Sequence, residues 1–160
     1  MYKHILIPTD GSSLSEKAIE AGIEFARFIH ARVTGFTAVP EYQVPMEAEL
    51  ASKHGRVVPG ILSPADHERE TRKRAELALQ TIADRARAAG VDYGAEFTQS
   101  DRPHEAIIRA AQQHGCDLIF MASHGRRGLS AMLHGSETQG VLTHSTIPAL
   151  VYREAAPQPH

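Results

Sequence analysis

Short, uninterrupted apolar runs constrain the fold of this chain more than any other feature of its 160 residues. The clearest are Ile5-Leu6-Ile7 and Leu118-Ile119-Phe120-Met121. A strand without polar alternation is typical of a sheet that is covered on both faces, as parallel sheets almost always are. The two runs therefore predict buried strands of a parallel sheet, one near each end of the chain.

Longer stretches with apolar residues at helical spacing separate the predicted strands. The first opens with Ser13 and Glu16, a candidate capping box. The longest opens with Ser63 and Pro64, a good N-cap and first helical residue, and ends at Gly90. This alternation predicts right-handed crossovers onto one parallel, twisted sheet, which is an α/β fold. We expect strands at residues 5–7, 32–39, 91–98, 117–121 and 147–152, and further helices from residue 103 and from about residue 135.

The stretch between the second strand and the longest helix, residues 40–62, has no sustained period. Its prolines and glycines predict a long mobile loop with one helical turn, and long loops in compact domains are often lids. The length of the chain fits one domain, which we expect to span residues 1–153, with residues 154–160 as a flexible tail.

Charge and cysteine content exclude several classes of protein. The 17 Lys and Arg residues are outnumbered by 19 Asp and Glu residues, so the chain lacks the basic excess typical of nucleic-acid binders. Its single cysteine, Cys116, cannot form an intramolecular disulfide and suits a reducing compartment. Because no apolar run approaches the ~18 residues of a membrane span, we expect a soluble, cytoplasmic protein that binds neither nucleic acid nor membranes.

A candidate phosphate site follows the fourth predicted strand. Ala122-Ser123-His124-Gly125 is followed, nine residues after Gly125, by Gly135-Ser136 at the predicted start of a helix. Small residues let the backbone approach a phosphate, and the N-terminus of a helix supplies N–H donors and a positive dipole end. We therefore predict that Gly135 and Ser136 hold a phosphate. Two ordinary strand-to-helix turns are the alternative interpretation.

Pro8-Thr9-Asp10-Gly11-Ser12 follows the first predicted strand, at the same carboxyl edge of the sheet. Together, the two motifs resemble the universal stress protein family. Its members begin with an Ile-Leu-Ile-Pro-Thr-Asp-Gly-Ser-like strand and turn, and its nucleotide-binding branch carries Gly-x2-Gly-x9-Gly-[Ser/Thr]. Here the second motif is Ala122-x2-Gly125-x9-Gly135-Ser136.

The resemblance covers about residues 2–153 and implies both a fold and a function. The implied fold is a five-stranded parallel αβα sandwich of strand order 3-2-1-4-5 that binds ATP. The family also implies a homodimer that pairs through the last strand, at about residues 148–153. On this basis we expect a nucleotide-dependent stress-response regulator or signalling module that passes its state to an unknown downstream protein through the 40–62 loop.

The resemblance also implies a role for individual residues. Asp10 would hydrogen-bond the ribose, because a carboxylate can accept from both hydroxyls, and Thr9 and Ala38 would border the adenine through backbone groups. Gly125, Gly135, Ser136 and Glu137 would surround the phosphates. Arg126 and Arg127 could reach a β- or γ-phosphate, with a solvated loop as the alternative. The complete predicted nucleotide site is Pro8, Thr9, Asp10, Ala38, Met121, Ala122, His124, Gly125, Arg126, Gly135, Ser136 and Glu137.

Ala122 departs from the family pattern, which has glycine there. Its methyl group matters if the residue needs a positive φ or lies against the nucleotide, and matters little in an ordinary extended conformation. Two functions therefore remain open: an ATP-binding protein, and a dimeric adaptor of the same family that binds no nucleotide. A third is an adenine-nucleotide hydrolase or transferase.

No catalytic or metal-binding set stands out in the sequence. The ten histidines lack metal-ligand spacing, so we expect no dedicated metal site, and Mg²⁺ would arrive with the nucleotide phosphates. There is no Walker lysine and no Gly-x-Ser-x-Gly elbow, and Cys116 is expected to be a buried packing residue. We expect ATP hydrolysis, if present, to be slow.

Overall fold

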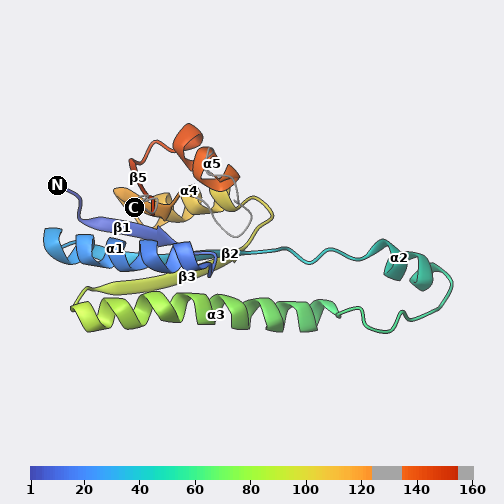
Figure 1. The fold of residues 1–160 in the computed structure, drawn as a ribbon. Coiled ribbons are helices and arrows are strands. Elements are labelled where there is room, and N and C mark those ends of the chain that lie inside the picture. The colour runs from blue at the N-terminus through green and yellow to red at the C-terminus, as the bar shows by residue number, and fades with distance from the viewer. Residues whose placement is uncertain (124–134, 155–160) are drawn as a thin grey trace, which may run out of the picture.

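A computed structural model of the chain describes residues 1–123 and 135–154 (Figure 1). Strands and helices alternate along it as predicted. The strands are β1 (His4–Pro8), β2 (Arg32–Val39), β3 (Tyr93–Gln99), β4 (Leu118–Ala122) and β5 (Ala149–Tyr152). The helices are α1 (Ser13–Ile29), α2 (Met46–Lys53), α3 (Pro64–Ala89), α4 (Pro103–Gln113) and α5 (Ser136–His144).

The five strands form one parallel sheet in the order β3-β2-β1-β4-β5, which confirms the predicted fold. The register places Ile5 of β1 between Val33 of β2 and Leu118 of β4. The direction in which strands are added reverses between β1 and β4, so these two strands flank the topological switch point where ligands of such sheets bind.

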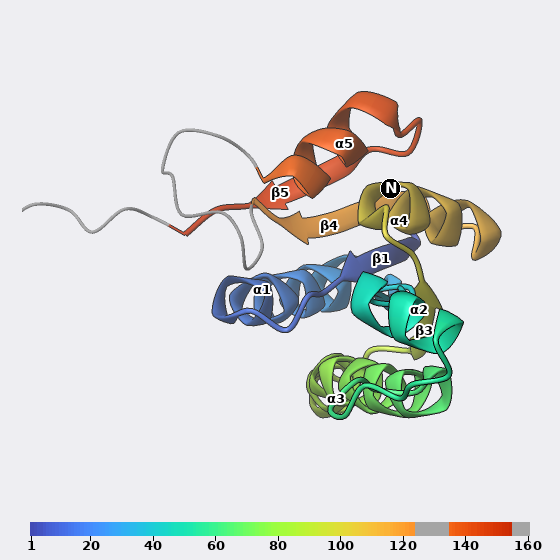
Figure 2. The ribbon, with the colours of Figure 1, turned by 90° about the vertical axis from the view of Figure 1, so that its right-hand side faces the viewer.

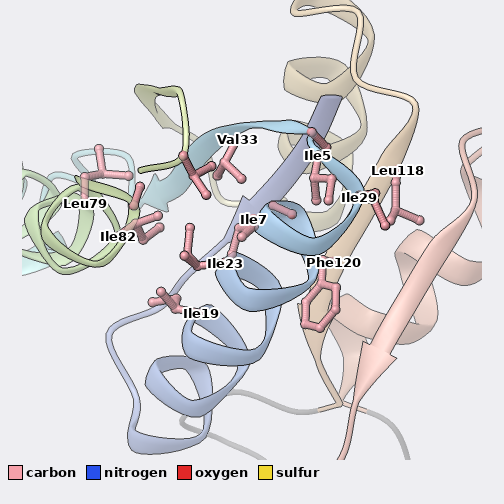
Figure 3. Close-up of a cluster of buried hydrophobic side chains, with 14 residues drawn as sticks. Ile5, Ile7, Ile19, Ile23, Ile29, Val33, Leu79, Ile82, Leu118 and Phe120 are labelled. Atoms are coloured by element: carbon pink, nitrogen blue, oxygen red, sulfur yellow. The ribbon is translucent and has the colours of Figure 1, made fainter. Parts of the chain in front are cut away.

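Helices cover both faces of the sheet, with α1 and α3 on one side and α4 and α5 on the other (Figure 2). Ile5 and Ile7 point into the cluster formed with α1 and α3, which Figure 3 shows, whereas Leu6 points into the cluster formed with α4 and α5. All three side chains are fully buried. Because both faces of β1 are covered, its sequence has no room for polar alternation.

Local capping signals set the ends of the helices, with one difference from the prediction. Ser12 caps α1 by accepting a 3.2 Å hydrogen bond from the Ser15 amide, so the predicted pair of Ser13 and Glu16 is wrong by one residue. Ser63 caps α3 as predicted, accepting from the Asp66 amide at 3.1 Å. The same helix ends at a left-handed glycine, Gly90, with φ of 68°.

The strand boundaries also shift slightly. β3 begins at Tyr93 and not at Val91, because the Val91 amide donates to the Ala86 carbonyl and closes the end of α3. Residues 40–62, predicted to contain a single helical turn, contain the eight-residue helix α2. We call residues 40–63 the arm, because Figure 1 shows α2 lying well beyond the end of the sheet. None of the helices in the described ranges is long and apolar enough to cross a membrane.

Candidate functional site

The turn after β1 is locked by hydrogen bonds centred on Thr9. The Thr9 amide donates to the Phe36 carbonyl at 2.8 Å, and the Thr9 carbonyl accepts from the Thr37 hydroxyl at 2.8 Å, so both groups bind β2. The buried Thr9 hydroxyl lies 2.6 Å from the hydroxyl of Ser15 on α1. Gly11 has a φ of 72°, a conformation that favours glycine. The turn therefore has a fixed shape at the carboxyl edge of the sheet.

Asp10 lies exposed on this turn. Its Oδ1 accepts a 3.0 Å hydrogen bond from the Ser12 amide, in the manner of an Asx turn at the start of α1. The predicted role of Asp10 as an acceptor for the ribose hydroxyl groups stays a prediction.

Hydrogen bonds join the end of β4 to the start of α5, although eleven residues lie between Ser123 and Gly135. The Gly135 amide donates to the Ser123 carbonyl at 2.9 Å, and the Ser123 amide donates to the Tyr152 carbonyl at 2.9 Å. The buried Thr138 hydroxyl donates to the Ala122 carbonyl, also at 2.9 Å. These bonds fix the N-terminus of α5 at the carboxyl end of β4.

The first turn of α5 resembles an anion site in its chemistry. The N-cap, Gly135, has no side chain to cap the helix, and its backbone is extended, with φ of −53° and ψ of 150°. The first N–H groups of an α-helix have no acceptor within the helix, and the aligned peptide dipoles make that end positive. Ser136 places an exposed hydroxyl beside these amides.

Glu137, predicted to contact phosphate, directs its carboxylate to another helix. Its Oε2 accepts from the backbone amide of His104 at 2.7 Å and lies 3.1 Å from Nδ1 of the same residue. The N-cap of α4, Arg102, contributes no side-chain cap of its own, so Glu137 caps α4 from α5. Gly140 lets the helices approach closely, because a Cβ there would lie 2.5 Å from His104 Cγ.

The remaining predicted residues lie along the same edge or outside the described residues. Pro8 ends β1 opposite Phe36, and Ala38 lies in β2 opposite Thr98. Met121 is buried in the cluster beneath α4 and α5, so it presents backbone and not side chain at the edge. His124, Gly125, Arg126 and Arg127 fall outside the residues that the structure describes.

Ala122 occupies the last position of β4, opposite Tyr152 of β5. Among residues 1–123 and 135–154, His30 is the one non-glycine residue with a positive φ, so Ala122 has an ordinary strand conformation. A methyl group at this position therefore introduces no backbone strain.

A cavity of about 370 Å³ lies between α4 and β3, and the sequence did not predict it. None of the described residues of the predicted nucleotide site lines it. Arg102 and Glu105 on its wall pair with each other at 2.9 Å, and Glu96 contacts His114. Four carboxylates, those of Glu41, Glu96, Asp101 and Glu105, line the cavity together with two arginines, Arg102 and Arg109, so the lining has more acidic than basic side chains.

The side chains with shifted pKa values do not belong to the predicted site. Burial raises the pKa of the Cys116 thiol to about 12, and raises the pKa of Tyr93 to about 12. Burial lowers the pKa of His4, whose Nε2 lies 2.8 Å from the Thr34 hydroxyl. Cys116 is buried, as predicted. Within the described part of the chain, no group of three or more His, Cys, Asp or Glu residues could hold a metal ion.

The sequence and the fold of this chain are similar to those of known proteins. Residues 1–153 match the sequence model of the universal stress protein family. Universal stress protein MJ0577 of Methanocaldococcus jannaschii is 29% identical over 159 residues, which cover 96% of this chain and 96% of the relative. Its solved structure superimposes with a TM-score of 0.76 at 25% identity, covering 98% of this chain and 99% of that chain.

Two further solved structures share the fold and contain adenine nucleotides. A universal stress protein in complex with cAMP has a TM-score of 0.66 at 21% identity, covering 96% of this chain and 98% of that chain. The universal stress protein from Archaeoglobus fulgidus in complex with dAMP has a TM-score of 0.64 at 16% identity, covering 94% of this chain and 97% of that chain.

Proposed function

This chain belongs to the universal stress protein family, and on that premise we propose that it binds an adenine nucleotide, ATP included, at the carboxyl edge of its sheet. The observation that carries the proposal is the 2.9 Å hydrogen bond from Gly135 to Ser123, which holds the N-terminus of α5 at the end of β4. The cAMP and dAMP complexes of structural neighbours support an adenine nucleotide as the ligand.

The phosphates bind the start of α5. Gly135 and Ser136 contribute backbone amides and a hydroxyl, and the helix dipole favours the negative charge. Glu137 takes part through its amide, because its carboxylate is engaged by α4. Gly125, His124 and Arg126 complete the phosphate contacts in this proposal. Mg²⁺ accompanies the phosphates and keeps most of its own water ligands.

The nucleoside binds the turn after β1. Asp10 accepts from the ribose hydroxyls, and the rigid turn around Thr9 holds its carboxylate in place. Pro8, Thr9, Ala38, Met121 and Ala122 border the adenine, mainly through backbone groups. Because Ala122 is extended, its methyl group adds surface to the site without displacing the chain.

The protein acts as a regulator and not as an efficient enzyme. We infer a cytoplasmic homodimer that reports its nucleotide state to a downstream protein and hydrolyses ATP slowly at most. β5 is the natural dimer surface, because it ends the sheet order and an edge strand offers its N–H and C=O groups to a partner. Leu150 of β5 is 37% exposed there.

Calorimetric titration of Mg·ATP into protein freed of bound nucleotide by unfolding and refolding tests this function. We expect one ATP per chain. Asp10→Asn should weaken binding at least tenfold, since a hydrogen bond to a charged group contributes about 1.5–3 kcal/mol. Asp92→Asn is the matched control, because Asp92 is an exposed aspartate immediately before β3, at the opposite edge of the sheet.

Gly135→Leu supplies a second test, since a bulky side chain at the start of α5 obstructs the phosphate. It should abolish binding and leave the dimer intact in light scattering. If correctly folded wild-type protein gives no heat and no thermal shift with ATP, the adaptor function replaces the nucleotide-binding one. Steady turnover well above background that Asp10→Ala abolishes would instead indicate a hydrolase or transferase.

A further inference from the structure

The arm, residues 40–63, exposes an unusual amount of apolar surface. Of the ten large hydrophobic residues that are exposed in the described ranges, five belong to this segment. Figure 1 shows α2 standing apart from the sheet and its covering helices. The five are Val44, Met46, Leu50, Val57 and Leu62.

The helix α2 is too short to be stable without packing. It has eight residues, Pro45 provides no side-chain cap, and none of its residues is buried against the described parts of the chain. Isolated helices shorter than ~12–15 residues are marginal in water. The described residues of this chain bury none of its side chains, so α2 has a surface that another molecule can cover.

The orientation of α2 is the reverse of that of a surface helix covering its own core. Ala48 and Ala51 are half-buried, whereas Met46 is 75% exposed and Leu50 is 52% exposed. Met46 and Leu50 are four positions apart, so they lie on one face of the helix. The larger apolar side chains of α2 face solvent.

The base of the arm is braced so that α2 projects from the sheet. Asp101, in the loop between β3 and α4, accepts from the Glu41 amide at 3.1 Å and from Gln43 Nε2 at 2.9 Å. The Tyr42 hydroxyl donates to the Leu62 carbonyl at 3.0 Å, and the Tyr42 ring lies 5.3 Å from the ring of His67 on α3. These contacts join the segments before and after α2 to each other and to the body of the protein.

The charges of α2 are arranged for pairing with a copy of itself. Glu47 and Glu49 lie in its first turn, and Lys53 lies in its last turn, followed by Arg56. Lys53 pairs with Glu49 within the helix at 3.3 Å, so Glu47 near one end and Arg56 just beyond the other are the charges that a partner would meet. When two such helices pack antiparallel about a two-fold axis, the acidic end of each meets the basic end of the other. A partner whose surface was entirely acidic or entirely basic would place like charges opposite one end of α2.

We propose that α2 docks against α2 of a second copy of this chain, antiparallel, with Met46 and Leu50 of both copies at the centre of the contact. This contact is separate from pairing through β5, so a chain that uses both surfaces forms assemblies larger than a dimer. It does not depend on nucleotide binding.

Energy transfer between arms of different copies tests the proposal. Ser52→Cys places a label on an exposed position of α2, and the native Cys116 stays unlabelled because it is buried with a raised thiol pKa. Transfer between donor- and acceptor-labelled copies should increase with protein concentration. Leu50→Asp should abolish this increase, whereas Leu77→Asp, on a 63% exposed leucine of α3, should leave it unchanged.

Charge-reversal variants distinguish a specific contact between two α2 helices from nonspecific hydrophobic association and from unfolding of α2. A Glu47→Lys/Glu49→Lys variant and a Lys53→Glu/Arg56→Glu variant should each self-associate at least tenfold more weakly than wild type. A mixture of the two should recover transfer between unlike copies. Transfer that Leu50→Asp does not change, a wild-type protein with no concentration-dependent transfer, or a mixture that fails to recover overturns the proposal.

Discussion

Gly140→Ala tests whether the close approach of α5 to α4 positions the candidate phosphate site. A Cβ at residue 140 would lie 2.5 Å from His104 Cγ and 2.9 Å from His104 Cβ. Rotation of the imidazole cannot relieve the contact with Cβ, so α5 or α4 must shift. Overpacking of this kind costs about 1–3 kcal/mol, while alanine is about 1 kcal/mol better than glycine inside a helix.

These opposing effects predict that the change in the free energy of unfolding caused by Gly140→Ala has opposite signs in the wild-type protein and in a variant that lacks the His104 side chain. In the wild-type background, Gly140→Ala should lower the free energy of unfolding by up to about 2 kcal/mol. In a His104→Gly background, which removes the Cβ of residue 104 as well as the ring, the clash is absent, so the same substitution should raise it by about 1 kcal/mol. His104→Gly retains the backbone amide that Glu137 caps, so α4 keeps its cap in both backgrounds.

Urea unfolding of the four proteins of this double-mutant cycle measures the effect. With an m-value of about 2 kcal/mol per molar urea, a change of about 2 kcal/mol shifts the midpoint by about 1 M. Nucleotide affinity should fall with the Gly140→Ala single variant, because the N-terminus of α5 moves, and should recover in the double variant. If Gly140→Ala has the same effect on stability in both backgrounds, the steric argument is wrong.

Three further predictions concern the core and the opposite edge of the sheet. Ile82→Ala should lower the free energy of unfolding by about 2–5 kcal/mol, because Ile82 is fully buried, while Leu77→Ala, on an exposed face of the same helix, should change it by no more than about 0.5 kcal/mol in urea unfolding. Burial lowers the pKa of His4, so the unfolded state binds the proton of this histidine more readily than the folded state does. The stability that His4 contributes is therefore complete above the ordinary histidine pKa of 6.5 and is lost as the pH falls below it. The urea midpoint should fall less between pH 7.5 and pH 5.5 in His4→Gln than in wild type, and an equal fall in both proteins would contradict the assignment. Cys116 should react with an aromatic disulfide reagent at pH 8 only after unfolding, releasing one thiolate per chain, since burial raises its thiol pKa to about 12; rapid reaction of folded protein would show that the site opens.

Prediction from the sequence was accurate where short-range signals are strong. The apolar runs around Ile5 and Leu118 identified buried parallel strands, and Ser63 and Gly90 identified both ends of α3. The start of α1 was misplaced because Ser12 and Ser13 are adjacent and either can cap a helix. The order of the strands came from family resemblance, since local periodicity does not say which strands are neighbours.

The sequence predicted which segments form the candidate site, and the structure showed where those segments lie relative to one another and which of their groups are in contact. The turn at Thr9 and the start of α5 lie at the carboxyl edge expected for a parallel sheet. Residue spacing gave no sign that Glu137 caps α4, because its partner, His104, is 33 positions away. Glu137 was predicted as a phosphate ligand from its place in the motif alone.

The sequence by itself determined the elements of this protein, because hydrophobic period, helix caps and glycine conformations depend on interactions within a few residues. Only the tertiary structure decided which distant groups meet. The bracing of the arm by Asp101 joins residues 58 and 60 positions apart. The outward face of α2 likewise depends on how the arm leaves the sheet. The same local sequence pattern is compatible with many different long-range contacts. Which of these contacts form depends on the packing of the whole chain.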